Sequence, residues 1–280
     1  MSRPVFSVVC VHNNEKVLND WLLEGLKDQD SKFEVILVDN TAGKFKSAAE
    51  GLNYGGAKAA GEYLVFIHQD VRLLSSDWLR RAEAFLRALP GLGVAGIAGM
   101  IGGKAGGIFR AGTIPVKNRI FFVYQGLEKE RLEFGSASGQ PVEVQTLDEQ
   151  LLIIPREVFL GGKFDAAACG GWHLYGVDYS LSARRRGFRT FALPLPVWHM
   201  SGGKLDADYF RTLNKVLEKH SAEKVLYTTC GLWHTSNLFN VLDLLLLAAR
   251  SQLARWAGRN TYGAKPYLDT LKMLLGRSGR

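Results

Sequence analysis

The triplet His68-Gln69-Asp70 combines residue types and a position that suit metal and phosphate chemistry. It directly follows an apolar run, residues 63–67, with the length and composition of a buried strand. In an open α/β sheet, ligands bind beyond the carboxyl ends of the strands. A carboxylate there can hold Mg²⁺ or Mn²⁺ against phosphate oxygens, because these cations favour oxygen ligands. The alternative is a polar turn that ends the strand, and the triplet alone leaves both open.

Strand and helix patterns alternate through the first hundred residues. Apolar β-type runs occupy residues 6–11, 33–38, 63–67 and 94–98, and helical spacings occupy residues 15–27, 47–60 and 75–89. This order predicts an α/β fold with a parallel sheet and helices on both faces. Residues 108–145 are expected to form a hairpin-rich insertion over the site. Further strands are expected at 142–145, 151–154 and 190–197, a helix at 174–186, and mostly helices beyond residue 203.

The composition is that of a globular protein, with 47% hydrophobic and 22% charged residues among 280. Its three cysteines are far apart and form no CxxC pair, which argues against a disulfide framework and favours a reducing compartment. The apolar run at residues 5–11 is too short for a signal peptide. We therefore expect a cytoplasmic protein. The first two-thirds of the chain is nearly balanced in charge and shows no nucleic-acid-binding pattern.

Five segments in which polar residues accompany apolar runs follow one another along the chain. They are residues 8–15, 35–41, 53–63 leading into His68-Gln69-Asp70, 176–181 and 198–203. This order resembles the family-2 glycosyltransferases with a GT-A fold, over about residues 5–203. The resemblance implies a GT-A type, mostly parallel Rossmann-like sheet with helices on both faces. It divides the chain into a glycosyltransferase domain (1–203, with a nucleotide-binding half 1–100 and an acceptor-binding half 101–203) and a helical, basic C-terminal extension (204–280).

The resemblance assigns a metal site. Asp70 matches the second Asp of the family's DxD motif, which would coordinate Mn²⁺ or Mg²⁺ between two phosphates. His68 replaces the first Asp; imidazole suits Mn²⁺ better than Mg²⁺, so His68 either joins the metal or contacts the sugar or a phosphate. His199 matches the histidine that the family places opposite the metal. A packed histidine beside Trp198 is the alternative.

The resemblance also assigns a general base. Asp178 matches the Asp of the family's Glu-Asp pair, with Val177 in place of the Glu. In those enzymes this Asp takes the proton of the acceptor hydroxyl, which makes a weak nucleophile competent. A single displacement of this kind inverts the anomeric carbon. The alternative for Asp178 is a helix N-cap.

Donor and acceptor contacts are expected on both sides of the metal. Asp39 matches the residue that accepts a hydrogen bond from the nucleotide base, which favours UDP or dTDP over GDP; the alternative is an Asx turn. Aromatic side chains ahead of Asp178 suit the apolar face of a saccharide or lipid-linked acceptor, although core aromatics show the same pattern. The expected substrate-binding residues are Cys10, His12, Asp39, Asn53, Lys58, His68, Trp172, His173 and Tyr175.

The C-terminal quarter is basic, with twelve Lys and Arg against six Asp and Glu from Lys204 onward. Residues 238–249 are apolar except for Asp243 and are too short to span a bilayer. They suit a helix that packs on the catalytic domain, forms a homodimer, or lies peripherally on the inner face of the cell membrane. The motif Gln252-Leu253-Ala254-Arg255-Trp256 matches that of processive polysaccharide synthases, and we interpret this match as fortuitous.

The sequence thus predicts an inverting, metal-dependent glycosyltransferase acting on a glycan, a lipid-linked saccharide or a metabolite. A non-catalytic nucleotide-sugar or carbohydrate-binding protein on the same fold is the alternative. The replacements at His68 and Val177 favour that alternative.

Overall fold

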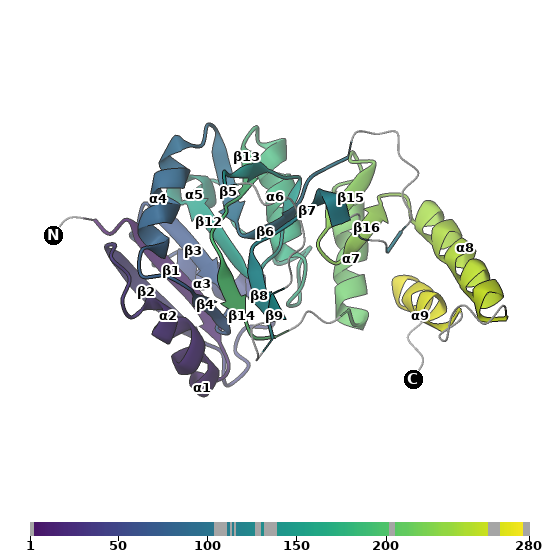
Figure 1. Ribbon diagram of the computed structural model, residues 1–280, viewed down its shortest axis with the longest axis horizontal. Helices are drawn as coiled ribbons and strands as arrows, with labels where there is room; N and C mark the ends of the chain where they lie inside the picture. The colour runs from purple at the N-terminus through teal and green to yellow at the C-terminus, as the bar shows by residue number, and fades with distance from the viewer. Residues whose placement is uncertain are drawn as a thin grey trace.

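The structure is a computed structural model that describes residues 3–103, 111–112, 114, 116–126, 130–131, 139–201, 205–256 and 264–276. Its centre is a seven-stranded sheet with helices on both faces (Figure 1). The strand order is β10-β13-β5-β12-β3-β1-β2. The strands are β1 (Phe6–His12), β2 (Phe33–Asp39), β3 (Tyr63–Ile67), β5 (Leu92–Gly96), β10 (Val142–Glu143), β12 (Leu151–Pro155) and β13 (Arg189–Ala192).

Five of these strands point the same way, which confirms the predicted, mostly parallel sheet. β1 pairs in parallel with β2 and β3, and β13 pairs in parallel with β5. β12 lies between β3 and β5 and is antiparallel to both, so the expectation of parallel pairing fails there. Leu151 pairs with Ile67, and His68 N–H donates to Gln150 O at 3.1 Å. The residues just before β12 therefore lie at the edge where β3 ends.

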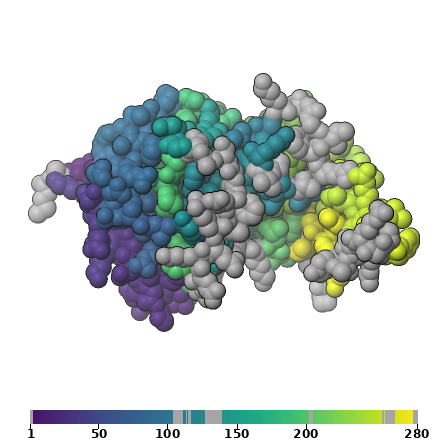
Figure 2. Space-filling view, viewed as in Figure 1, coloured from purple at the N-terminus to yellow at the C-terminus, as the bar shows by residue number. Residues whose placement is uncertain are grey.

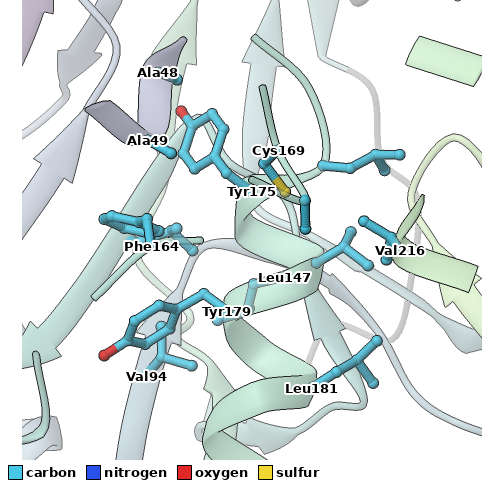
Figure 3. Close-up of a cluster of buried hydrophobic side chains, with 14 of the residues drawn as sticks. Ala48, Ala49, Val94, Leu147, Phe164, Cys169, Tyr175, Tyr179, Leu181 and Val216 are labelled. Atoms are coloured by element: carbon cyan, nitrogen blue, oxygen red, sulfur yellow. The ribbon is translucent and has the colours of Figure 1, made fainter. Parts of the chain in front are cut away.

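Helices cover the sheet because each presents apolar side chains to one of two buried clusters. One cluster joins the sheet to α3, α5 and α6, and Figure 3 shows Tyr175 of α6 projecting toward Ala48 and Ala49 of α3. The other cluster includes Leu22 of the π-helical segment and Trp78 of α4. The helices are α1 (Glu15–Val17), a π-helical segment (Leu18–Leu23), α2 (Glu24–Leu26), α3 (Ala48–Gly56), α4 (Trp78–Ala88), α5 (Arg156–Leu160) and α6 (Tyr175–Arg185).

Smaller sheets flank the carboxyl edge of the central sheet. One contains, in order, β4 (Val71–Leu73), β14 (Val197–His199), β8 (Val123–Gln125) and β9 (Glu130–Arg131). Another contains β11 (Thr146–Leu147), β6 (Ala98–Met100) and β7 (Arg119–Phe121). The 3₁₀ turn Val116–Asn118 directly precedes β7. The predicted strand at 190–197 is two strands, β13 and β14. Pro194 and Pro196 lie between them, where a ladder donor would otherwise be needed. Much of the predicted insertion at 108–145 lies outside the described residues.

The C-terminal part continues from the same core. It comprises α7 (Ala207–Lys219), the hairpin β15 (Val225–Thr228) and β16 (Gly231–His234), α8 (Asn237–Trp256) and α9 (Lys265–Leu274). Phe210 and Leu213 of α7 belong to the buried cluster that includes α3 and α6. The predicted boundary at residue 203 stays a prediction. Among the described residues, no helix combines the length and apolar character needed to cross a bilayer.

Gly61 allows the loop before β3 to pass directly over β1. A Cβ at this position would lie 2.6 Å from Ser7 N and 2.7 Å from the carbonyl carbon of Phe6. Because both atoms belong to the main chain of a central strand, we expect Gly61→Ala to lower the free energy of unfolding by about 1–3 kcal/mol. Urea denaturation measures this. Gly139→Ala, whose Cβ would meet nothing within 4 Å, is the matched control; equal midpoints for the two variants would contradict the close-approach argument.

Candidate active site

Three side chains that can bind a cation converge beyond the carboxyl end of β3. His68 and Asp70 come from the turn that links β3 to β4, and His199 ends β14. β14 is antiparallel to β4, with His199 opposite Val71, so the strand pairing brings residue 199 to the turn. His199 Nε2 lies 3.4 Å from Asp70 Oδ1, and one ligand atom from each of the three residues lies within 4.8 Å of the others. The structure thus brings together the two predicted metal ligands, Asp70 and His199, with His68, for which the sequence left metal binding and substrate contact both open.

Neighbouring side chains fix the orientation of the cluster. Ser201 donates to Asp70 Oδ2 from its main-chain N–H at 3.2 Å and from its hydroxyl. The Gln125 amide lies 3.3 Å from His199 Nδ1, because β8 pairs with β14 at this position. Such outer contacts hold metal-binding side chains in a defined orientation.

Tyr175 links His68 to the loop before β12. Its hydroxyl lies 2.8 Å from His68 Nε2 and donates to Glu149 O at 3.1 Å. A hydroxyl that donates to the carbonyl accepts from Nε2–H, which leaves the lone pair of His68 on Nδ1. A neutral imidazole with a free lone pair is the form that binds a metal.

Gln69 ties this turn to the loop after β1. Its Oε1 accepts from the main-chain N–H groups of Asn13 and Asn14 at 3.1 and 3.0 Å, and its Nε2 donates to Asn13 Oδ1 at 2.7 Å. The middle residue of the triplet is therefore structural. It aligns the ends of β1 and β3, which form one wall of the site.

The electrostatics of the cluster suit a divalent cation. Burial alone would raise the pKa of Asp70, but the hydrogen bond and charge of His199, together with His68 and Ser201, hold it well below its usual range. Burial, and then the charge of His199, lower the pKa of His68. The cluster therefore offers an ionised carboxylate and an uncharged imidazole. Two nitrogen donors with one carboxylate fit Mn²⁺ better than Mg²⁺, which prefers oxygen.

Two pockets meet at this cluster. The first, of about 240 Å³, is lined by the ends of β1 and β3 and by α3. The second, of about 280 Å³, is lined by the loop before β12, the segment before α6 and the β15–β16 hairpin. Asp70 lines the first, His199 lines the second, and His68, Trp172 and Ser201 line both. A cation held by the cluster would lie between two ligands, one in each pocket.

Several predicted substrate contacts line these pockets. His12 and Tyr175 line the first, His173 lines the second, and Trp172, 44% exposed, lines both. Asp39 is absent from the lining; its Oδ1 accepts from Thr41 N–H at 2.8 Å, as the Asx-turn alternative requires, and Asn40 lines the first pocket instead.

Three other predicted contacts point elsewhere. Cys10 is fully buried in the core beneath the sheet. Asn53 donates to Phe164 O at 2.8 Å and accepts from Phe164 N–H at 3.0 Å, and Lys58 Nζ lies 4.0 Å from the ring centroid of Tyr54. None of the three lines either pocket. The structure does not support Cys10, Asn53 or Lys58 as direct ligand contacts.

Asp178 also lies away from both pockets. It is 2% exposed, Lys219 Nζ donates to its Oδ2 at 2.8 Å, and His220 Nε2 lies 2.8 Å from its Oδ1. Both carboxylate oxygens are therefore engaged by α7 and the residue after it. Asp178 lines neither pocket, so its role as general base stays a prediction that this geometry does not favour.

The second pocket contains two carboxylates that the sequence reasoning did not select. Asp148 and Glu149 precede β12 and line the pocket near His68 and His199. Glu149 Oε1 accepts from Leu174 N–H at 2.6 Å. Leu174 has φ +62°, the one non-glycine residue with positive φ among those described, and strain of this kind clusters at functional sites. Burial, and then the charge of Asp148, raise the pKa of Glu149 from 4.5 to about 8.

Comparisons with known proteins agree with this architecture. Residues 7–220 match the model of the "Glycosyltransferase like family", and the chain belongs to that family. The resemblance to family-2 glycosyltransferases is thereby confirmed. A comparison with curated protein sequences gave no significant match.

Solved structures with the same fold include two glycosyltransferase complexes. The mannosyltransferase PcManGT from Pyrobaculum calidifontis, in complex with GDP-Man and Mn²⁺, is 15% identical with a TM-score of 0.55, covering 98% of this chain and 85% of its own. GalNAc-T7 with UDP, GalNAc and Mn²⁺ is 14% identical with a TM-score of 0.50, covering 77% of this chain and 48% of its own. At these identities the likeness shows the fold, which confirms the GT-A prediction.

Loss of the Asp70 carboxylate removes the one anionic ligand of the cluster. We expect Asp70→Ala to weaken Mn²⁺ binding by at least about tenfold, measured by isothermal titration calorimetry on the purified chain. Asp20→Ala removes an equally charged but exposed carboxylate that pairs with Lys16, and it should leave Mn²⁺ affinity unchanged. Equal Mn²⁺ affinity in both variants would show that the cation binds elsewhere.

Proposed function

We propose that the chain is an inverting, metal-dependent glycosyltransferase that moves a sugar from a nucleoside diphosphate sugar to an acceptor hydroxyl. The observation that carries this proposal is the position of the His68-Asp70-His199 cluster between two pockets. A transferase of this kind needs one space for the nucleotide, another for the acceptor, and positive charge where the diphosphate departs. A divalent cation at the cluster would supply that charge as a Lewis acid.

The first pocket suits the nucleotide end of the donor. It lies beyond the carboxyl ends of β1 and β3, where open α/β sheets bind ligands. Asn40 and His12 offer polar groups beside the apolar Val11 and Leu52, the mixture that a nucleoside requires. The fold neighbours bind GDP-Man in one case and UDP with GalNAc in the other. We retain UDP or dTDP as the proposed carrier, although Asp39, the residue on which that preference rested, pairs with His12 across β1 and β2 and does not line the pocket.

The second pocket suits the acceptor. Trp172 and His173 offer ring surfaces on which the apolar face of a sugar can stack, and Arg119 and Thr229 offer polar groups. A glycan, a lipid-linked saccharide or a hydroxylated metabolite has the required chemistry. The proposed acceptor hydroxyl lies in this pocket, on the far side of the cluster from the nucleotide.

Glu149 replaces Asp178 in this proposal as the general base. The acceptor oxygen bonds to the anomeric carbon while its proton passes to the Glu149 carboxylate. The bond from the anomeric carbon to the diphosphate oxygen breaks, and its electron pair leaves with the nucleoside diphosphate. The attack comes from the side opposite the leaving group, so the configuration inverts. Leu174 N–H holds Oε1 of Glu149 at 2.6 Å, which orients the carboxylate for this transfer.

A non-catalytic sugar-nucleotide-binding protein is the second candidate. The occupied carboxylate of Asp178 and the imidazole at position 68 favour it. The two candidates differ in turnover. Incubation with UDP-, dTDP- and GDP-sugars and Mn²⁺ should release nucleoside diphosphate from at least one donor, and Asp70→Ala should abolish the release. Donor binding by calorimetry without any release, in the presence of saccharide acceptors, would favour the non-catalytic candidate.

Glu149→Gln tests the assignment of the base. The amide keeps the contact with Leu174 N–H but cannot take a proton, so we expect kcat to fall by about 10²–10⁴-fold while Mn²⁺ and donor binding persist. Asp178→Asn is the matched control. It leaves the ammonium of Lys219 with one carboxylate fewer and should reduce stability, while kcat per folded molecule stays within a few-fold. A large loss of kcat in Asp178→Asn, with kcat of Glu149→Gln nearly unchanged, would instead identify Asp178 as the general base.

The raised pKa of Glu149 gives this test a pH signature. The folded pKa of about 8 exceeds the value of 4.5 for an unperturbed Glu, so the folded form holds its proton over this window. The contribution of protonated Glu149 to the free energy of unfolding is fully present below pH 4.5, and it is lost as the pH rises through about 8. Glu149→Gln should therefore gain stability relative to the wild type between these values, and kcat/KM of the wild type should rise with pH toward about 8.

A further inference from the structure

The outward face of α8 is an exposed apolar surface. Figure 1 shows α8 at the end of the molecule opposite the N-terminus, and Figure 2 shows atoms of this helix on the surface there. It packs against α9 and β16. Large apolar side chains of α8 that are 45–76% exposed are Leu238, Phe239, Leu242, Leu245, Leu246, Leu253 and Trp256. We call these seven residues the α8 apolar face.

Helical geometry places the α8 apolar face on one side. At 3.6 residues per turn, the seven positions fall within an arc of about 120°. The residues of α8 that the fold buries lie on the opposite side of the helix: Asn240, Leu244, Ala248 and Ser251. The fold therefore covers one side of the helix and leaves the opposite, apolar side exposed. Packing against the catalytic domain does not account for the α8 apolar face.

The one acidic residue of α8 does not place its charge on this face. Asp243 Oδ2 accepts from Ala111 N–H at 2.9 Å and lies 3.0 Å from His234 Nε2. The carboxylate is thus turned toward the body of the protein. Arg250 on the same helix, and Lys265 and Lys272 on α9, which packs against α8, are exposed cations; Lys272 Nζ lies 3.8 Å from Asp269 Oδ1.

Charge distinguishes a lipid surface from a second copy as the occupant. Residues 237–280 contain seven Lys and Arg against two Asp and Glu. Two copies that met through the α8 apolar face would bring like charges together, whereas an anionic bilayer carries the opposite charge. Trp256, 76% exposed at the end of the helix, is of the type enriched at membrane interfaces.

We propose that the α8 apolar face inserts in the plane of an anionic phospholipid surface, with the basic residues around it against the headgroups. The helix lies parallel to the bilayer, as interfacial amphipathic helices do. This inference does not require catalysis, because it concerns a surface that shares no residue with either pocket.

Vesicle sedimentation of the full chain, without donor or metal, tests the proposal. We expect binding to vesicles that contain phosphatidylglycerol, weaker binding to pure phosphatidylcholine, and loss of binding as ionic strength rises. The triple variant Phe239→Ser/Leu246→Ser/Leu253→Ser should reduce the partition coefficient by about tenfold or more. Leu160→Ser on α5, 47% exposed, is the matched control and should bind as the wild type does.

Three outcomes would overturn the proposal. The full chain fails to sediment with anionic vesicles, the triple variant binds as well as the wild type, or binding is equal on both kinds of vesicle. A concentration-dependent dimer that the triple variant abolishes, seen by sedimentation velocity, would assign the face to a second copy instead. All three substituted positions are more than half exposed, so we expect the triple variant to fold. Circular dichroism checks this.

Discussion

Asp70 carries a negative charge at a position where it is only 7% exposed, and the neighbouring chain segments are arranged to compensate that charge. An unpaired buried carboxylate is costly, so partners must be supplied by tertiary structure. Ser201 and His199 supply them from the end of β14, some 130 residues along the chain. The pairing of β14 with β4 and β8 therefore brings these compensating groups to the turn after β3, and it assembles the His68-Asp70-His199 cluster.

The second pocket depends on a different constraint, a strained residue before α6. Leu174 adopts a left-handed conformation, which costs a non-glycine residue about 1–2 kcal/mol. Its side chain is 2% exposed and packed in the core, which stabilises a conformation that the main chain alone disfavours. In return, its N–H points at Glu149, and Tyr175, the next residue, reaches His68 and the main chain of Glu149. The strained conformation of Leu174 thus positions Glu149 of the second pocket relative to His68, which lines both pockets.

The sequence was sufficient for local features and insufficient where distant segments decide the chemistry. The apolar run before His68 and the order of the early elements predict the sheet and its helices, because these patterns depend on neighbours in the chain. Only the family resemblance, and no local pattern, predicts that Asp70 and His199 share a site. Glu149 was missed because it is adjacent to the site only if β12 runs antiparallel to β3, and the alternating pattern of strands and helices favoured parallel pairing. Asp178 is predicted as the base from the family resemblance, and its engagement by Lys219 and His220 leaves no local signal because they lie 41 and 42 residues away.

The hairpin β15–β16 gives the second pocket a wall that the first pocket lacks, through Thr228, Thr229 and Cys230. This wall is encoded after residue 220, beyond the segment that matches the family model, whereas the His68-Asp70-His199 cluster lies within that segment. The second pocket is therefore shared between the two parts of the chain, since His68 and His199 line it together with the hairpin. A substitution in the hairpin would reshape this pocket without replacing any residue of the cluster. The shape of the pocket and the composition of the cluster are thus separately encoded.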